Sequence, residues 1–245
     1  KLLVDDKGAV VGVEAENTRG NGDTYTLNAN KGVVLATGGF GSNIEMRKKY
    51  NPEMDEKYNS TDSVADTGDG IVMAEEIGAE LRDMSYIQTY PLCDVVSGAL
   101  LYVDDARLYG FSILVNAEGK RFVNELGRRD VLSKAILSQT GGVCYEVMDQ
   151  SAFEEAKIME NHGGEVAYLT ANNGLVKADT LEEAAKLMGV DPAQLVETVK
   201  QYNSYVDAQH DAEFERKAMN KKIENGPFYL VKATPAVQST QKLKC

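Results

Sequence analysis

GVVLATGGFGSN, residues 32–43, is the stretch that decides how the first part of the chain is expected to fold. Its apolar run, residues 33–35, is typical of a strand that is buried on both faces of a sheet. The run ends at two glycines, where the missing Cβ lets a ligand approach the backbone closely. Residues 44–50 then form a predicted helix, capped by Asn43 or Ser42. Strand, glycine turn and helix in this order predict an α/β fold.

The segments around this stretch complete a first domain. Residues 1–17 predict two strands joined by an Asp/Gly turn, and residues 23–30 predict a third strand, so the three should form an antiparallel meander. Residues 67–81 predict a helix after a polar loop. Apolar residues recur along one side of that helix at spacings of three and four, namely Ile71, Met73, Ala74, Ile77 and Leu81.

The pattern changes after about residue 84, where we place a domain boundary. Residues 97–125 predict strand, turn and strand, and four helices are predicted at 130–139, 149–160, 180–188 and 192–207. Thr180 and Asp191 are the expected caps of the last two helices, and Gly189 is expected to end the first of these. The predicted fold class is therefore α/β for residues 1–84, followed by an α+β domain over residues 85–240.

Composition excludes several classes of partner. The 245 residues carry a formal charge of -12, which repels nucleic acid and anionic lipid, so we expect neither as a partner. Three cysteines at unrelated spacings argue against a disulfide framework or a zinc site. No apolar run approaches the roughly 18 residues of a membrane span, so membrane insertion is not expected. His162 and His210 lie in polar stretches and are predicted to be exposed loop residues.

Two glycine-containing stretches are candidate ligand sites, each with a simpler explanation. Gly38 and Gly39 could admit a ligand at the end of the predicted strand, or merely form a tight turn. Gly68, Asp69 and Gly70 precede a helix whose N-terminal N–H groups could bind an oxygen-rich ligand, or Asp69 could simply be the N-cap. The residues themselves leave both alternatives open.

Five stretches together resemble a known family in their order along the chain. They are GVVLATGGFGSNIEMRKKYNP, TGDGIVMAEEIGAEL, DMSYIQTYP, ILVNAEGKRFVNELGRRD and PFYLVKATPAV. This combination resembles the flavoprotein of the fumarate reductase/succinate dehydrogenase superfamily, in its soluble flavocytochrome-type branch. The resemblance covers residues 1–240 and is specific, although each stretch alone is a weak signal.

The resemblance implies FAD as cofactor and a mobile clamp domain that closes over the substrate. Residues 1–84 would belong to the FAD domain and residues 85–240 to the clamp. The residues implied to bind FAD are Ala36, Thr37, Gly38, Gly39, Gly68, Asp69 and Gly70. The family's early G-x-G-x-x-G motif and its later N-R-L-G-G segment are absent, and both ends look cut. We therefore expect a fragment that holds flavin weakly or not at all by itself.

The resemblance also implies a catalytic arginine at Arg129. In the family, the residue before the aspartate of this motif delivers a proton to the substrate, while reduced flavin gives a hydride to the neighbouring carbon. Arginine is a poor acid in water, so this role needs a dry site and a relay that replaces the proton. Arg128 is expected to make a structural or relay ion pair, and Asp130 to orient Arg129 or cap the following helix.

Departures from the family indicate the substrate. Fumarate reductases carry His where this chain has Tyr90, and a relay glutamate where it offers Asp104 or Asp105. We predict Asp105 as the catalytic partner of Arg129 and Asp104 as a substrate-binding residue, with the opposite assignment as the alternative. The family's H-H-T near the end of the clamp is replaced by Gln238, Ser239 and Thr240, of which the first two are predicted to bind substrate.

A phenol and an acid in place of basic groups suit a substrate with a donor or weak cation at its far end. Urocanate, with a carboxylate and an imidazole, fits, and the changes resemble the urocanate reductase subgroup. Fumarate or an aryl acrylate is the alternative substrate, and a non-catalytic fragment is the alternative function. The family further implies anaerobic respiration, an electron-donor domain or subunit carrying haem or FMN outside this chain, and a periplasmic or cell-envelope location.

Overall fold

The computed structural model describes residues 1–238, which form two compact units. The first unit holds residues 1–56, 62–87 and Gln238, and the second holds residues 57–61 and 88–237. Residues 57–61 thus pack with the second unit although they lie within the first predicted segment. The functional roles given to the two segments, FAD domain and clamp, stay predictions.

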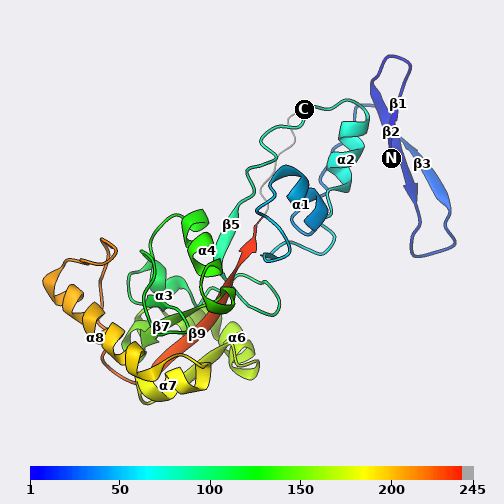
Figure 1. Ribbon diagram of the computed structural model, residues 1–245. Helices are drawn as coiled ribbons and strands as arrows, with labels where there is room; N and C mark the ends of the chain where they lie inside the picture. The colour runs from blue at the N-terminus through cyan, green and yellow to red at the C-terminus, as the bar shows by residue number, and fades with distance from the viewer. Residues whose placement is uncertain (239–245) are drawn as a thin grey trace. The chain divides into compact units, whose positions relative to one another are not determined.

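The first unit begins with the predicted antiparallel meander, which is confirmed. Strands β1 (Leu2–Val4), β2 (Val10–Glu16) and β3 (Thr24–Asn28) pair in chain order (Figure 1). The turn between the first two strands is closed by Asp5, whose Oδ1 accepts from the backbone N–H groups of Lys7 and Ala9, each at 2.9 Å. This is the local hydrogen bonding that favours aspartate in turns.

Both helices predicted for the first unit are present. Helix α1 (Ile44–Tyr50) is capped by Asn43, whose side chain accepts from the backbone N–H of Met46 at 2.9 Å. Helix α2 (Asp69–Glu76) buries Ile71 and Ala74 on one side. It ends at Glu76, so the observed helix is shorter than the predicted one, whose apolar pattern extended to Ile77 and Leu81.

The prediction of a buried strand at residues 33–35 is wrong. Residues 32–39 form no strand, and none of the strands in residues 1–238 pairs with them. Val34 is 90% exposed. An extended segment becomes a strand only when a neighbour takes up its backbone N–H and C=O groups, and a continuous apolar run cannot specify whether that neighbour is present.

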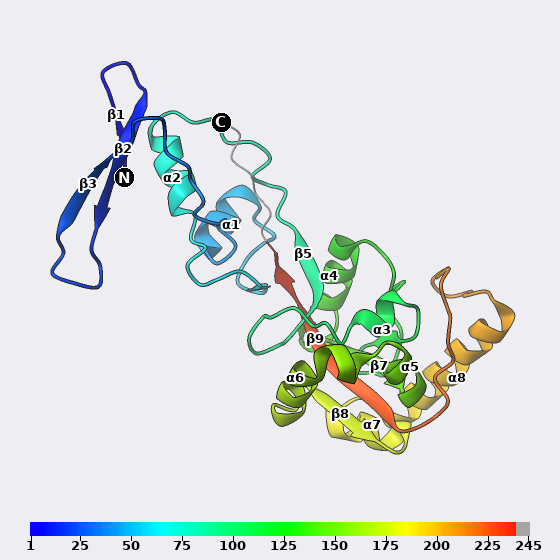
Figure 2. The same ribbon diagram turned by 180° about the vertical axis from the view of Figure 1, so that it is seen from behind.

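The second unit is built on one mixed sheet around its last strand, β9 (Phe228–Val237). The other strands are β4 (Asn59–Ser60), β5 (Thr89–Cys93), β6 (Ile113–Val115), β7 (Cys144–Asp149) and β8 (Leu175–Ala178). Strand β9 pairs antiparallel with β5, β7 and β8 and parallel with β4, and β6 extends the sheet from β7. Figure 2 shows β9 running through the centre of this unit.

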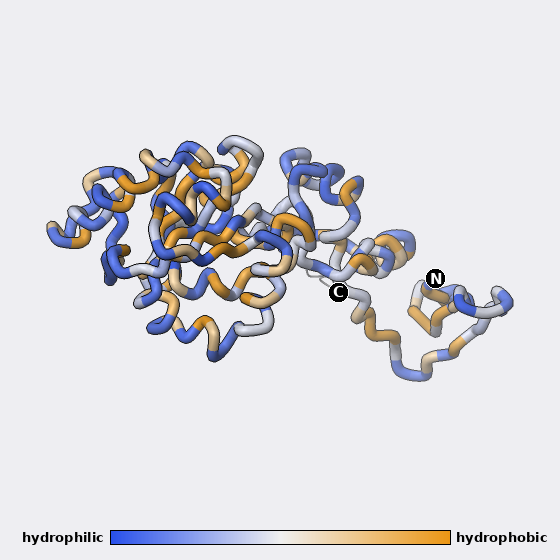
Figure 3. Tube along the Cα trace, turned by 90° about the horizontal axis from the view of Figure 1, so that it is seen from below, coloured by the Kyte–Doolittle hydropathy of each residue, from blue (hydrophilic) through white to orange (hydrophobic). Residues whose placement is uncertain are grey.

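Helices cover both faces of this sheet, because its strands alternate their apolar side chains between two cores. Tyr229 and Val231 of β9 join the core with helices α4, α5 and α6, whereas Phe228 and Leu230 join the core with α7 and α8. The helices are α4 (Arg129–Leu137), α5 (Gln150–Glu155), α6 (Ile158–Ala171), α7 (Leu181–Met188) and α8 (Pro192–Ala208). Figure 3 shows hydrophobic stretches of the chain gathered in the interior of this unit.

The four helices predicted for this unit are present, with one correction. The helix expected at 149–160 is two helices, α5 and α6, because Lys157 between them adopts a left-handed conformation with φ 54°. The predicted caps Thr180 and Asp191 each accept a hydrogen bond from the backbone N–H three residues on, and Gly189 ends α7 in the left-handed conformation.

Two further expectations are corrected in the second unit. The predicted strand–turn–strand over 97–125 contains only β6 as a strand, and a short helix, α3 (Asp105–Leu108), occupies its middle. His162 is not an exposed loop residue: it lies inside α6 with a side chain only 20% exposed. His210 is in an exposed loop, as predicted. Within residues 1–238, we find no helix with the length and hydropathy of a membrane span.

Candidate functional site

A buried acid–arginine pair lies at the centre of the candidate site in the second unit. Arg107 Nε donates to Asp104 Oδ1 at 2.5 Å, and Arg107 Nη2 donates to Asp104 Oδ2 at 2.6 Å. Asp104 is 1% exposed and Arg107 is 3% exposed. This two-pronged geometry is the strongest form of a carboxylate–guanidinium contact, so it fixes both side chains.

Tyr90 is joined to this pair from the neighbouring strand β5. Its hydroxyl donates to Asp104 Oδ2 at 3.3 Å. Burial, and then the charge of Asp104, raise the pKa of Tyr90 far above that of an exposed phenol, so it stays neutral and keeps its proton to donate. Because that proton is directed to Asp104, the lone pairs of the phenol oxygen are left to accept from another group.

Arg129 lies over the face of Tyr90. The guanidinium carbon of Arg129 is 4.8 Å from the centre of the Tyr90 ring, which is a cation–π contact. Arg129 is the first residue of α4, and Arg128 before it turns to the surface, where it is 82% exposed and donates to both carboxylate oxygens of Asp130 at 3.0–3.1 Å. The adjacent arginines therefore face different surroundings, and Asp130 contacts Arg128 rather than capping α4 by its side chain.

A small cavity of about 150 Å³ opens beside these side chains. It is lined by Tyr90, Pro91, Arg107, Leu108, Leu126, Gly127, Arg129 and Leu132. One phenol and two guanidinium groups therefore face a largely apolar space, an arrangement suited to a flat carboxylate with a polar far end. A larger cavity of about 580 Å³ in the same unit includes none of the predicted site residues in its lining.

Asp105, predicted as the catalytic acid, faces a different neighbour from Asp104. Its Oδ2 lies 3.3 Å from Nε2 of His162 in helix α6, and its side chain is 32% exposed. The adjacent aspartates therefore have different partners: Asp104 contacts Tyr90 and Arg107, whereas Asp105 contacts His162 of α6. The catalytic role of Asp105 stays a prediction.

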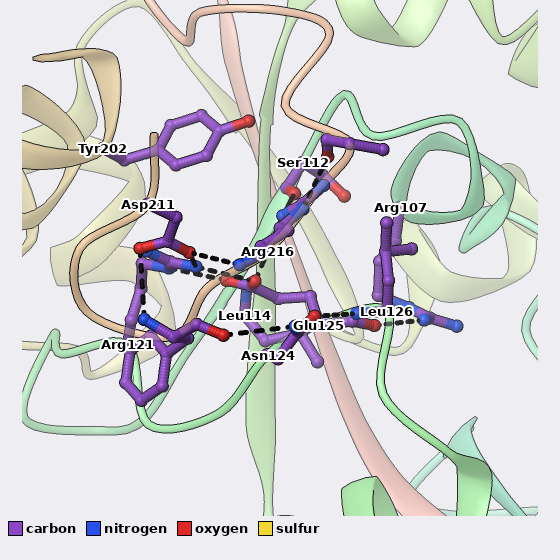
Figure 4. Close-up of polar contacts among 12 residues, drawn as sticks. Arg107, Ser112, Leu114, Arg121, Asn124, Glu125, Leu126, Tyr202, Asp211 and Arg216 are labelled. Atoms are coloured by element: carbon purple, nitrogen blue, oxygen red, sulfur yellow. Dashed lines mark hydrogen bonds and ion pairs between the residues drawn. The ribbon is translucent and has the colours of Figure 1, made fainter. Parts of the chain in front are cut away.

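A buried ionic network holds the loop that leads to Arg129 (Figure 4). Arg121 donates to both carboxylate oxygens of Glu125 at 2.7 and 2.8 Å and to Asp211 at 2.8 and 3.2 Å. Arg216 pairs with the same Glu125 at 3.2 Å. The backbone carbonyl of Glu125 then accepts from Arg107 Nη1 at 2.6 Å, so the network connects directly to the acid–arginine pair.

Glu146 of β7 is a second buried acid near this site. It is fully buried, and Ser112 Oγ donates to its Oε1 at 2.6 Å, whereas its Oε2 has no hydrogen-bond partner among residues 1–238. Burial, and then the charge of Asp104, raise the pKa of Glu146 well above the ordinary value. The carboxyl group of Glu146 therefore keeps its proton to a higher pH than an exposed glutamate does.

The residues predicted to bind FAD lie together in the first unit. A Cβ added at Gly70 would come within 1.9 Å of Thr37 Oγ1, and one added at Gly38 would come within 1.9 Å of Asp66 Oδ1. Ala36, Thr37 and Gly38 are exposed, and Gly68 is the N-cap of α2, in the left-handed conformation at φ 87°. Asp69 follows Gly68 as the first residue of α2 and accepts from Thr67 Oγ1 at 2.9 Å, so it is not the N-cap.

Residues 36–38 of this glycine-rich region are open to a dinucleotide such as FAD, whereas Gly68 and Gly70 are buried. The two stretches, residues 36–39 and 68–70, meet where a Cβ at Gly70 would collide with Thr37, whereas a Cβ at Gly38 would collide with Asp66 outside both stretches. A surface with this little side chain admits close contact between backbone N–H groups and phosphate or ribose oxygens.

Of the three residues predicted near the end of the clamp, 238–240, Gln238 is not among the residues that line the cavity of about 150 Å³. Gln238 is half-buried in the first unit, and Ser239 and Thr240 lie outside the described residues. Cys93 and Cys144 are buried free thiols, in agreement with the expected lack of a disulfide framework for those two. Across residues 1–238, no group of three or more His, Cys, Asp or Glu side chains could hold a metal ion.

Several site residues were not identified from the sequence. Arg107 lies three residues after Asp104, and Glu125 lies four after Arg121, which are spacings at which opposite charges meet on a helix or turn. This signal could have revealed both pairs. Nothing in the sequence connects Asp211 and Arg216 to them, because they are brought in by a distant loop.

Comparisons with known proteins identify the family to which this chain belongs. Residues 1–242 match the model of the FAD binding domain family. Urocanate reductase of Eggerthella lenta is 49% identical over 98% of this chain and 39% of the relative, and fumarate reductase (cytochrome) of Shewanella frigidimarina is 37% identical over 98% and 40%. The chain thus spans about two-fifths of the length of these relatives.

A solved structure shares the fold. The open conformation of a flavocytochrome c3 fumarate reductase superposes with a TM-score of 0.76 at 35% identity, over 97% of this chain and 40% of that chain. A 3-ketosteroid delta1-dehydrogenase from Sterolibacterium denitrificans superposes with a TM-score of 0.67 at 25% identity, over 96% and 46%. The match across residues 1–242 and this shared fold establish that the chain belongs to the FAD binding domain family, whose cofactor is FAD.

Proposed function

We propose that this chain is part of an FAD-dependent reductase of the C=C bond of an unsaturated carboxylate, and that the acid is urocanate. The cluster of Tyr90, Asp104, Arg107 and Arg129 around one small cavity is the observation that carries the proposal. The relatives named urocanate reductase and fumarate reductase support the same reaction class. Urocanate would be converted to imidazole propionate.

The two units would divide this work. Residues 36–39 and 68–70 of the first unit would hold part of FAD, which, when bound, supplies the hydride. The second unit would be the clamp that carries the proton donor. The electron donor, a haem or FMN domain or subunit, would lie outside this chain.

Arg129 would protonate the carbon next to the one that receives hydride. A guanidinium with a pKa above about 12 gives up a proton only where water is excluded and the product anion is stabilised at once. Leu108, Leu126 and Leu132 line the cavity, but Arg129 is exposed and Leu108 is 52% exposed, so FAD and substrate bound over the cavity would have to exclude the water. Arg107 in the same cavity would stabilise the charge that builds on the substrate carboxylate.

Arg107 lines the same cavity as Arg129, so the relay that returns a proton to Arg129 would run through Arg107 and its partner Asp104, an alternative to the predicted relay through Asp105. Asp104 contacts Arg107 in the cavity wall, whereas Asp105 is paired with His162. Burial raises the pKa of Asp104, although the charge of Arg107 opposes the shift, so this carboxyl takes up a proton more readily than an exposed one.

Tyr90 is the reason to prefer urocanate over other 2-enoates. Its hydroxyl proton is engaged by Asp104, so its oxygen is an acceptor for a ring N–H. Imidazole has such an N–H, whereas the phenyl ring of an aryl acrylate has none. Fumarate would place a second carboxylate against this acceptor, which is unfavourable without an additional donor.

The test is turnover by the full-length, FAD-loaded protein with a reduced dye as electron donor. Urocanate, fumarate and cinnamate are compared in parallel under the same conditions. The proposal expects the highest kcat/KM with urocanate. A higher value with fumarate would overturn the substrate, and no oxidation of the dye with any of the three acids would overturn the reaction class.

A further inference from the structure

We propose that Glu165 and His162 of helix α6 are positioning residues for the proton relay. They hold the turn of residues 102–105, and thereby set the place of Asp104 and Arg107. This inference rests on the proposed function, because it concerns the relay of that reaction. Neither α6 residue lines the cavity itself.

Glu165 binds this turn through its backbone. Both oxygens of its carboxylate accept from the N–H of Tyr102, at 2.9 and 3.1 Å, and Oε2 also accepts from the N–H of Val103 at 3.1 Å. The side chain reaches across from α6, more than 60 residues later in the chain. A carboxylate that accepts backbone N–H groups is a strong and directional contact, so it fixes the peptide planes just before Asp104.

His162 binds the same turn through two side chains. Its ring stacks on the ring of Tyr102, with centroids 5.5 Å apart and planes inclined by 19°. Its Nε2 also lies 3.3 Å from Asp105 Oδ2. His162 therefore contacts both residues that flank the buried Val103–Asp104 segment.

The backbone of α6 is bent where these contacts are made. His162 has φ -130° and ψ 24°, outside the helical region, and two glycines follow it. The apolar residues Ile158, Val166 and Leu169 keep both parts of α6 in the core. A helix with a break at this position, anchored before and after it, presents His162 and Glu165 to one short turn.

The consequence for the site follows from the shortness of the segment. Val103 is fully buried and separates Tyr102 from Asp104, and Arg107 lies one turn further along α3. Release of the Tyr102 and Val103 N–H groups would loosen the backbone that aims Asp104 at Arg107 and Tyr90. A misplacement on the order of 1 Å in such a group is enough to cost on the order of a hundred-fold in rate.

The experiment uses the full-length, FAD-loaded protein with Glu165→Ala, Glu165→Gln and Glu160→Gln variants. Glu160 is the control, because it lies on the same helix with its side chain 69% exposed. We expect Glu165→Ala to lower kcat by on the order of a hundred-fold with KM within about two-fold, and to increase the solvent isotope effect on kcat. Glu165→Gln retains one acceptor oxygen and should recover part of the loss.

Hydrogen exchange of the 102–107 backbone is the second measurement. The amide protons there should exchange faster in Glu165→Ala and at the unsubstituted rate in Glu160→Gln, while the flavin spectrum stays unchanged. His162→Phe, which keeps the stack on Tyr102 but cannot bind Asp105, should give an intermediate loss of kcat.

The outcomes separate the two proposals. An unsubstituted protein that reduces none of the three acids overturns the proposed function and this inference with it. An active protein whose Glu165→Ala variant keeps its kcat, or keeps its hydrogen-exchange protection at 102–107, overturns the positioning role alone. A Glu165→Ala loss that appears wholly in KM also overturns it, because a displaced proton relay acts on the chemical step.

Discussion

The guanidinium carbon of Arg129 lies 4.8 Å from the centre of the Tyr90 ring, and the hydroxyl of that ring donates to Asp104 at 3.3 Å. The candidate proton donor is thus held against the residue that we expect to select the substrate. A cation over an aromatic face is stabilised by the negative potential of the ring. Both arginines carry a fixed charge, but Arg129 lines the cavity, whereas Arg128 does not and is 82% exposed.

Arg129→Ala should abolish turnover in the full-length protein while leaving flavin bound. Loss of a general acid lowers kcat by about 10²–10⁴-fold. Arg128→Ala is the matched control, because this neighbouring arginine makes only a solvent-exposed pair with Asp130 among the contacts described, and such pairs contribute about 0–1 kcal/mol to stability. Steady-state kinetics of the two variants, with their flavin spectra, make the comparison; near-normal turnover of Arg129→Ala would remove this residue from the mechanism.

Tyr90→His should shift the substrate preference toward fumarate. An added imidazole can donate to a second carboxylate, and the phenol oxygen that accepts the urocanate ring N–H is lost. The ratio of kcat/KM for fumarate to that for urocanate should rise by about ten-fold or more, the worth of one hydrogen bond to a charged group.

Tyr90→Phe tests the hydroxyl alone, since it keeps the ring beneath Arg129. We expect a higher KM for urocanate and no change for cinnamate, whose ring cannot donate. Equal losses with the two acids would contradict the role given to the Tyr90 oxygen.

Asp104→Asn should destabilise the protein, because it leaves the guanidinium of Arg107 buried without its counter-charge. Removing one partner of a buried ion pair costs about 3–5 kcal/mol in the free energy of unfolding. Asp105→Asn, at a partly exposed pair with His162, should cost about 0–1 kcal/mol. Urea unfolding of the two variants measures the difference, and equal costs would show that Asp104 and Asp105 are not distinguished as described.

Glu146→Gln should remove part of the pH dependence of stability. Because the folded pKa of Glu146 is raised, the folded state holds a proton that the unfolded state releases above about pH 4.3, the ordinary glutamate value. The free energy of unfolding therefore falls with rising pH, by up to about 1.4 kcal/mol per pH unit, until the folded pKa is reached.

The amide in the Glu146→Gln variant does not titrate, so this contribution to the pH dependence of the free energy of unfolding is absent. The variant should match the unsubstituted protein near pH 4 and be more stable at pH 7–8, as measured by urea unfolding. Glu197→Gln, at a side chain 64% exposed on α8, is the control and should leave the slope unchanged. A Glu146→Gln variant that is less stable at neutral pH would show that the ionised form is the native one.

Gly70→Ala should weaken flavin binding. The new Cβ would come within 1.9 Å of Thr37 Oγ1, so the two stretches proposed to hold FAD must move apart. Val72→Ala in the same helix changes a side chain that is 43% exposed and should leave the flavin content unchanged. Flavin absorbance per mole of purified full-length protein measures the effect, and full occupancy in Gly70→Ala would argue against this part of the predicted nucleotide site.

The sequence by itself determined the local structure and the family. Capping residues such as Asn43, Thr180 and Asp191, and the turn at Asp5, act within a few residues of the chain, so their contacts could be predicted from type and spacing. The motif order that identifies the FAD binding domain family is likewise a property of the linear sequence. Arg129 was selected in this way, and the structure places it beside Tyr90.

Tertiary structure decided what depends on neighbours that are distant in the chain. The apolar run 33–35 looks like a buried strand, yet it has no strand partner among residues 1–238, because pairing is a property of two segments. Asp104 and Asp105 are alike in sequence, but one turns to Arg107 and the other to His162, 57 residues away. Which of two adjacent carboxylates enters a site is fixed by the packing of other elements around it, and no local spacing contains that information.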